Sequence, residues 1–331
     1  MNEVLSEKEY QHYIRDYLVQ HNGFEDRTYQ LSEKDALDGP TFDMTRAMDP
    51  ELVIRFLDTT QPKVMESLRK LYKEKAETTL LNYINNEVCK PGGSLIDVLK
   101  NGFYINGQHV DLMYTRPATS FNPELVEKCE ANIFSVHEEV WASSKERIDL
   151  VLFLNGLALF SVELKCNAAG QDYHDAIRQY RTERDPKDRL FLWKSGCIAN
   201  FAMDLEEVYV ATKLSGESTF FMPFNKGRGE GINAGAGNPL IEGDYAVSYM
   251  WKDIWTKDTI LDLLSKFIYV EKKKAKDHDT GKTKTKETLI FPRYHQLDLI
   301  RKVLADVKEN HSSQNYLVQH SAGSGKSNSI A

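Results

Sequence analysis

The segment from Arg147 to Lys165 constrains the fold more than any other part of the chain. Two apolar, β-prone runs flank Asn155-Gly156, a dipeptide typical of tight β-hairpin turns. The charged residues Asp149, Glu163 and Lys165 interrupt these runs. A charge in a buried strand is costly unless it is paired or binds a metal ion. The segment therefore predicts a hairpin with a functional cluster of charges at its end. The alternative is a surface hairpin whose charged edge faces water.

These three side chains are the kinds that a magnesium-dependent phosphodiester hydrolase needs. Carboxylates bind hard cations through oxygen, so Asp149 and Glu163 are the predicted Mg²⁺ ligands. Lys165 can orient the attacking water and stabilise the charge that develops on the phosphate. An Asp/Glu-x-Lys triplet alone is weak evidence, because the chain contains it at four positions. Only the copy at Glu163 lies in an apolar strand with an acid on the partner strand.

Strand parity sets a geometric condition on this site. Directly opposed residues of antiparallel strands share a face of the sheet. A regular two-residue turn would pair Asp149 with Val162 and place it on the opposite face from Glu163. We therefore predict a three-residue loop, Leu154-Asn155-Gly156, with a left-handed glycine and with Asp149 opposite Ser161. An equivalent one-residue bulge nearer the site would also satisfy the condition.

Apolar periodicity predicts the other elements. Helices are expected at Ser6–His21, Glu51–Asn86, Gly170–Glu183 and Asp258–Val270. Further strands are expected at Phe103–Ile105, Ile133–Val140, Cys197–Phe201, Glu207–Thr212 and Thr219–Met222. Tyr180 belongs to the apolar stripe of its helix and should pack against the sheet.

Several short segments carry a resemblance to a known family. They are Ile148–Val151, Leu154–Leu157, Glu163–Lys165, Ala176–Tyr180, Phe221–Gly227 and Gly235–Pro239. On these segments, Asn132–Pro186 resembles the nuclease domain of the restriction (R) subunits of type I restriction-modification enzymes, a branch of the Asp…Glu-x-Lys nuclease superfamily. The resemblance implies an α/β fold with a mixed-sheet, restriction-endonuclease-like core flanked by helices. It also implies that Asp149, Glu163 and Lys165 are catalytic.

A second motif, His320–Ser327, follows the apolar run Tyr316–Gln319. Its glycines would let backbone N–H groups cradle phosphates, Lys326 would reach the β and γ phosphates, and Ser327 would ligate Mg²⁺. The predicted ATP-binding residues here are Gly323, Ser324, Gly325, Lys326 and Ser327. His320 stands where the common pattern has glycine, as in the similar helicase-like motors of the same family. The alternative is a Gly/Ser-rich tail.

The segment Phe291–Gln296 resembles the adenine-reading segment of superfamily 2 motors, with Gln296 in the base-reading position. Three regions are therefore expected: a nuclease domain at 1–270, a basic linker at 271–290, and the truncated start of a RecA-like ATPase domain at 291–331. Glu271–Glu287 holds seven lysines against four acids and predicts a flexible linker. Only four residues follow Ser327, so we expect no ATP hydrolysis by this chain.

Basic residues follow the hairpin although the net charge is −7. They are Arg178, Arg181, Arg184, Lys187 and Arg189. Such a stripe favours contacts with a phosphate backbone, and the predicted DNA-binding residues are Arg178, Gln179, Arg181 and Arg184. The alternative is a solvated helix face. Related nucleases often carry a Gln-x-x-x-Tyr pair on this helix, but Glu183 stands in the tyrosine position here.

Composition bounds the class of protein. With 41% hydrophobic and 27% charged residues the chain is typical of soluble globular proteins. The start of the chain does not resemble a signal peptide, and the longest apolar run is too short for a membrane span. The four cysteines show no Cys-x-x-Cys spacing and are expected to be reduced. A cytoplasmic protein without a membrane partner is expected.

The best interpretation is the Mg²⁺-dependent DNA endonuclease portion of a type I R subunit. By resemblance, the complete subunit joins methylation and specificity subunits, translocates double-stranded DNA using ATP, and cuts at a distance. Two alternatives remain open. One is a stand-alone repair or defence nuclease, and the other is an inactive module that docks on the methylation–specificity complex.

Overall fold

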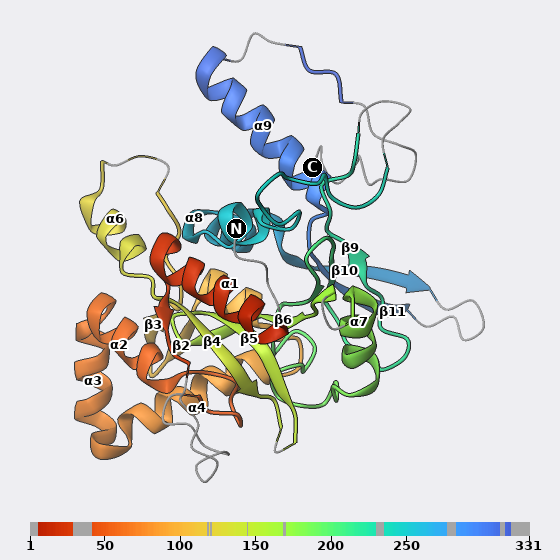
Figure 1. Cartoon of the computed structure of the whole chain (residues 1–331). Coiled ribbons are helices and arrows are strands. Elements are labelled where there is room, and N and C mark those ends of the chain that lie inside the picture. Colours follow the sequence, from red (N-terminus) through yellow and green to blue (C-terminus); the bar gives the residue numbers. More distant parts are fainter. Residues whose placement is uncertain are drawn as a thin grey trace.

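The computed structural model describes residues 6–28, 42–117, 119, 121–143, 145–167, 170–229, 235–276, 283–311 and 315–318. At its centre is a mixed seven-stranded sheet with the strand order β1-β4-β5-β6-β7-β8-β9 (Figure 1). The strands are β1 Glu25–Asp26, β4 Phe134–Trp141, β5 Arg147–Leu154, β6 Leu157–Leu164, β7 Ala199–Met203, β8 Val208–Ala211 and β9 Met222–Pro223. The pairs β1–β4 and β6–β7 are parallel, and the other neighbouring pairs are antiparallel.

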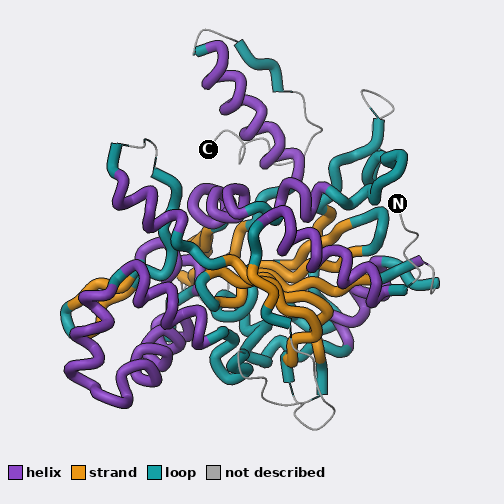
Figure 2. The backbone as a smooth tube through the Cα atoms, turned by 60° about the vertical axis from the view of Figure 1, so that its left-hand side comes forward, coloured by secondary structure: helices purple, strands orange, loops and turns teal. Residues whose placement is uncertain are grey.

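Helices flank both sides of this sheet (Figure 2). They are α1 Glu7–Asn22, α2 Pro50–Thr60, α3 Pro62–Tyr72, α4 Ala76–Cys89, α5 Leu95–Asn101, α6 Pro123–Glu130, α7 Tyr173–Thr182, α8 Lys257–Asp262 and α9 Tyr294–Asn310. The predicted α/β architecture is therefore confirmed. The helical prediction over Glu51–Asn86 is confirmed, but the segment is divided into α2, α3 and α4, because Pro62 starts a new helix and Lys73 adopts a positive φ of 53°.

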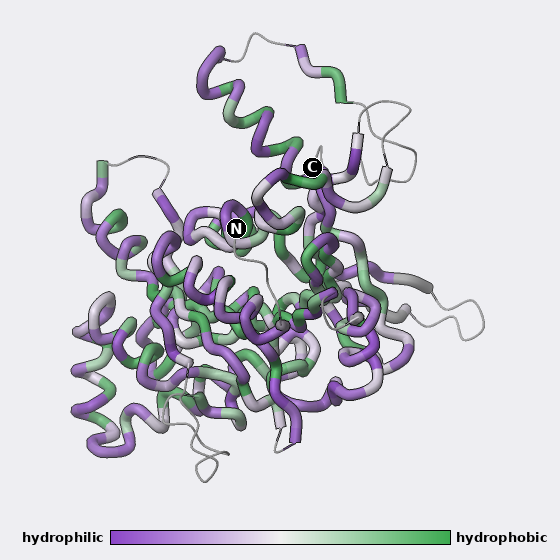
Figure 3. Tube along the Cα trace, viewed as in Figure 1, coloured by the Kyte–Doolittle hydropathy of each residue, from purple (hydrophilic) through white to green (hydrophobic). Residues whose placement is uncertain are grey.

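The two faces of the sheet have different helical covers. Helix α1 packs Tyr10, Ile14 and Leu18 into the larger apolar core, which also contains Val162 and Leu164 of β6. Helix α7 packs on the other face through Ala176, Ile177 and Tyr180, which belong to the smaller apolar core. Figure 3 shows apolar segments concentrated in the interior and hydrophilic residues on the outer helices. Strand β6 is buried along its whole length, so charges within it need partners.

Helix α7 confirms the predicted helix near Gly170–Glu183 and the predicted packing of Tyr180. The Tyr180 side chain is fully buried, and its hydroxyl lies 2.8 Å from Ser161 Oγ in β6. Ser161 Oγ also donates to Asn200 Oδ1 of β7 at 2.7 Å. These contacts fix α7 against the strand that carries Glu163.

Two small hairpins lie outside the main sheet. Strands β2 Phe103–Ile105 and β3 Gln108–Val110 flank a turn at Asn106-Gly107. Strands β10 Tyr269–Lys276 and β11 Thr283–Ile290 pair antiparallel, so the prediction of a flexible linker is wrong for these residues. Threonine alternates with lysine over Thr283–Lys286 of β11, and this alternation is a strand pattern that a count of charges does not reveal.

The predicted helix over Asp258–Val270 is divided. Helix α8 ends at Asp262, a π-helical turn covers Leu263–Phe267, and β10 begins at Tyr269. Within the described ranges, no helix combines the length and the apolar character that crossing a bilayer requires.

Candidate active site

The turn between β5 and β6 has two residues. Leu154 pairs with Leu157, and the turn residues Asn155 and Gly156 have φ angles of 51° and 79°. Two positive φ angles are typical of a type I′ turn, which favours Asn-Gly. The predicted three-residue loop is therefore wrong, although Gly156 has the expected positive φ. Asn155 fixes the turn by accepting from Ile133 N at 2.7 Å.

A one-residue bulge in β6 brings Asp149 and Glu163 to the same face of the sheet, which a two-residue turn without a bulge would not do. The register shifts between Leu152 and Phe153, which leaves Leu159 as an extra residue on β6. Beyond the bulge Leu150 pairs with Val162, and the same register puts Asp149 opposite Glu163. The prediction of a bulge nearer the site is confirmed, whereas Ser161 as the partner of Asp149 is wrong. The two carboxylates therefore share a face of the hairpin.

Asp149 is half-buried at the end of β5. Its Oδ2 atom accepts a hydrogen bond from the backbone N of Leu164 at 2.7 Å. Burial raises the pKa of Asp149 to about 6, against the opposing effects of this hydrogen bond and of the Lys165 charge. The backbone of Asp149 is also held, because its carbonyl accepts from Gln11 Nε2 of α1 at 2.8 Å.

Glu163 is fully buried, and its two carboxylate oxygens have different surroundings. Oε1 accepts a hydrogen bond from Arg184 Nε at 2.7 Å. Oε2 has no hydrogen-bond partner within the part of the chain that the structure describes. Burial and the neighbouring Asp149 charge raise the pKa of Glu163, while Arg184 opposes that rise. An unpaired buried carboxylate oxygen is costly and calls for a ligand.

Lys165 directly follows β6 and is almost completely buried. Its Nζ donates to Glu7 Oε2 at 2.9 Å and to the carbonyl of Leu164 at 2.8 Å. Glu7 lies in the first turn of α1, where acids are common because they complement the helix dipole. Sequence analysis therefore had no signal that Glu7 would contact Lys165.

The residues predicted to contact DNA lie in different environments. Arg184 is only 7% exposed, and besides Glu163 it contacts the carbonyl of Arg147 at 3.1 Å. Arg178 is exposed and pairs with Asp175 at 2.7 Å. Arg181 donates to the carbonyl of Thr219 at 3.0 and 3.2 Å. The structure thus separates Arg184 from Arg178 and Arg181 and places it at the carboxylate pair.

Arg178 and Arg181 line a pocket between α7 and β8. Tyr173 and Tyr209 also line it, and their rings stack with centroids 4.4 Å apart. Gln179 lies half-buried on the same helix, and its Oε1 has no hydrogen-bond partner among the described residues. DNA binding by these side chains stays a prediction.

A magnesium ion fits the carboxylate pair. Mg²⁺ prefers oxygen ligands and is commonly held by one or two carboxylates together with waters and substrate phosphates. Asp149 and Glu163 supply two carboxylates on one face, and Glu163 Oε2 is available for a ligand. Within the described ranges, no group of three or more His, Cys, Asp or Glu residues is arranged to hold a metal. Water and phosphate would therefore complete the coordination.

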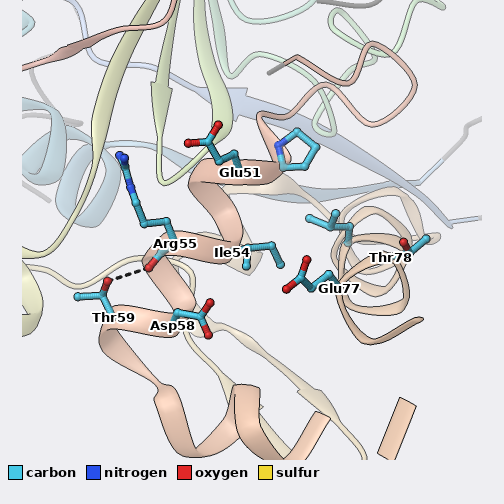
Figure 4. A pocket seen from close by; sticks show the side chains of 9 residues that line it. Glu51, Ile54, Arg55, Asp58, Thr59, Glu77 and Thr78 are labelled. Atoms are coloured by element: carbon cyan, nitrogen blue, oxygen red, sulfur yellow. Dashed lines mark hydrogen bonds between the residues drawn. The ribbon is translucent and has the colours of Figure 1, made fainter. Parts of the chain in front are cut away.

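The described surface contains another pocket, between α2 and α4 (Figure 4). Its polar lining includes Glu51, Arg55, Asp58 and Glu77. None of the predicted site residues lines this pocket, so it is separate from the carboxylate pair.

The predicted nucleotide-binding residues are only partly covered by the structure. Gln296 is buried in the first turn of α9, where its Oε1 accepts from Arg293 N at 3.0 Å. Gly323–Ser327 lie outside the described residues. ATP binding therefore stays a prediction.

Two comparisons with known proteins find sequences related to this chain. Residues 52–218 match the family model described as "Type I restriction enzyme R protein N terminus". A protein of Methanocaldococcus jannaschii, whose name assigns it provisionally as the endonuclease subunit of type I restriction enzyme MjaVIIIP, is 23% identical over 326 residues. That alignment covers 92% of this chain but 27% of the relative, so the chain spans about a quarter of the relative's length. The family match covers half of the chain and includes the hairpin and Arg184, and the chain belongs to the family of type I restriction enzyme R protein N termini.

Proposed function

We propose that this chain carries the nuclease centre of a type I restriction enzyme R subunit and hydrolyses phosphodiester bonds in DNA with Mg²⁺. The observation that supports this most is the register of β5 and β6, which sets Asp149 opposite Glu163. The free Oε2 of Glu163 and the adjacent Lys165 complete the set of groups that such a reaction needs.

The metal, when bound by Asp149 and Glu163, would polarise the phosphate and lower the pKa of an attacking water. Arg184 holds Glu163 Oε1 and favours the ionised form of that carboxylate, which leaves Oε2 to face the metal. Asp149 must also lose its proton, and because burial raises its pKa, metal binding should weaken as pH falls.

Lys165 would act on the phosphate through the one N–H donor that its two hydrogen bonds leave free. An ammonium group has three donors, and Glu7 and the Leu164 carbonyl accept two of them. These contacts fix Nζ at the end of β6, close to the carboxylate pair. The third N–H would stabilise the charge on a non-bridging oxygen or orient the water.

Nicking of a supercoiled plasmid by the purified chain tests this function. Wild type should cut with Mg²⁺ and not with EDTA, whereas Glu163→Gln and Lys165→Met should lose activity by a factor of at least about 100, as for the loss of a group that acts in the transition state. Asp185→Asn is the matched control, because Asp185 belongs to another Asp-x-Lys triplet but is exposed. Equal cutting by wild type and Glu163→Gln would contradict the proposal.

The partners of the complete subunit are part of the same proposal. The family membership supports assembly with methylation and specificity subunits, and the use of ATP by a motor outside the nuclease region. Co-purification of this chain with those subunits tests the assembly. Assembly without any metal-dependent cutting would favour an inactive docking module, and cutting without assembly would favour a stand-alone nuclease.

A further inference from the structure

The hairpin of β10 and β11 is firmly attached to the body of the protein at its base. Leu289 and Phe291 are buried at 3% and 5% exposure. The Phe291 ring packs against the rings of Phe201 and Phe224, with centroids 5.9 and 5.6 Å apart. Lys194 forms an ion pair with Glu287 of β11. The hairpin therefore leaves the body in a defined direction, as Figure 1 shows.

Beyond the base, the hairpin is strongly basic. Its two eight-residue strands hold six lysines, two glutamates and no arginine. Both glutamates are already used at the base: Glu287 contacts Lys194 and, at 3.4 Å, Lys272, while Glu271 lies 2.9 Å from Lys273. Lys274 and Lys286 are exposed and form no ion pair within the described ranges. A local positive surface thus exists on a chain of net charge −7.

The register of the hairpin adds to this excess charge. Lys273 is directly opposite Lys286. Like charges at opposed positions of an antiparallel pair destabilise the hairpin, and a two-stranded hairpin is only marginally stable by itself. Glu271 offsets part of the Lys273 charge, and a polyanion would remove the remaining repulsion between the two lysines.

We infer that the β10–β11 hairpin binds the sugar-phosphate backbone of duplex DNA without reading its sequence. Lysine is a flexible point charge that suits phosphate contacts, whereas base readout commonly uses the planar fork of arginine. A two-stranded ribbon is also narrow enough to lie along a groove of the duplex. This inference rests on the proposal that DNA is the substrate, and it assigns the holding of DNA to a surface distinct from the carboxylate pair.

Binding of a short fluorescein-labelled duplex of arbitrary sequence tests this inference by fluorescence anisotropy in EDTA, so that no cleavage occurs. Lys273→Ala/Lys286→Ala should weaken binding about tenfold at low salt. The slope of log affinity against log salt should become shallower by nearly two, because each lost phosphate contact removes about 0.9. Lys70→Ala/Lys75→Ala is the matched control, because both lysines are exposed on the helical region and the charge change is equal.

The outcomes separate this inference from the proposed function. Unchanged affinity and salt slope in Lys273→Ala/Lys286→Ala would overturn the inference, even if the chain cuts DNA normally. Weaker binding of polyglutamate with unchanged binding of DNA would also overturn it, because the hairpin would then fit an acidic protein. Hairpin-dependent binding in a chain that never cuts would support the inference while the proposed function fails.

Discussion

Arg184 Nε lies 2.7 Å from Oε1 of Glu163, so the buried glutamate is neutralised on one oxygen and open on the other. The guanidinium comes from the segment that follows α7, and Glu163 comes from β6. Because α7 is fixed to β6 through Tyr180 and Ser161, this ion pair is set by the tertiary fold. Arg184 thereby keeps a costly buried carboxylate available to a cation.

Removal of this partner should destabilise the metal-free protein. Arg184→Met leaves an uncompensated buried charge, and the expected loss at neutral pH is about 3 kcal/mol, limited by protonation of Glu163. Urea denaturation of wild type and Arg184→Met in EDTA measures this loss of stability.

The double variant Arg184→Met/Glu163→Gln supplies the control, because it removes both charges. Its loss of stability should be smaller than the sum of the two single losses. Strictly additive losses would show that the ion pair does not couple the two residues.

Asp149 should make the metal-free protein less stable as pH rises. Burial raises its pKa to about 6 in the folded chain from the ordinary value of 3.8, so the folded state holds this proton more tightly. The contribution to stability is therefore complete below about pH 4 and is lost as pH rises through about 6. Asp149→Asn should gain stability over wild type across this window, by at most about 3 kcal/mol, since each pKa unit corresponds to about 1.4 kcal/mol.

Denaturation at the two ends of this pH window, in EDTA, measures that difference. Titrating groups that do not interact with Asp149 cancel in the comparison, whereas the pKa of Glu163 falls when the Asp149 charge is removed. A difference in stability between the two proteins that does not change with pH would be evidence against a raised pKa at Asp149.

Local pattern predicted much of the fold. Alternating apolar residues around Asn155-Gly156 predicted the hairpin, and its charged residues predicted which end would carry the site. The position of the bulge could not be predicted, because Leu157–Phe160 is apolar throughout and satisfies either register. The partners of Glu163 and Lys165 also could not be predicted from the sequence. Arg184 and Glu7 lie 21 and 158 residues away along the chain, and only tertiary packing brings them together.

The turn itself should be sensitive to substitution. In Gly156→Ala the new Cβ would lie 2.4 Å from the carbonyl oxygen of Asp49, and φ is +79°. We expect a loss of about 3 kcal/mol from the clash and the left-handed backbone together. Gly107→Ala is the control, because its φ is +76° but nothing lies within 4 Å of the new Cβ.

The control should lose only about 1–2 kcal/mol, the cost of the left-handed backbone alone. Chemical denaturation compares the two variants. Similar losses in both would show that close packing of Gly156 against Asp49 does not hold the hairpin in register.

The central claim is that Asp149 and Glu163 bind one divalent cation together. Titration with Mn²⁺, which takes the same oxygen ligands as Mg²⁺ and is detected by electron paramagnetic resonance, tests this without requiring activity. Wild type at about pH 8, where metal-binding carboxylates are deprotonated, should bind the ion. Asp149→Asn and Glu163→Gln should each weaken binding at least about tenfold, and Asp185→Asn should bind as wild type does. Equal Mn²⁺ affinity in wild type, Asp149→Asn and Glu163→Gln would contradict the account.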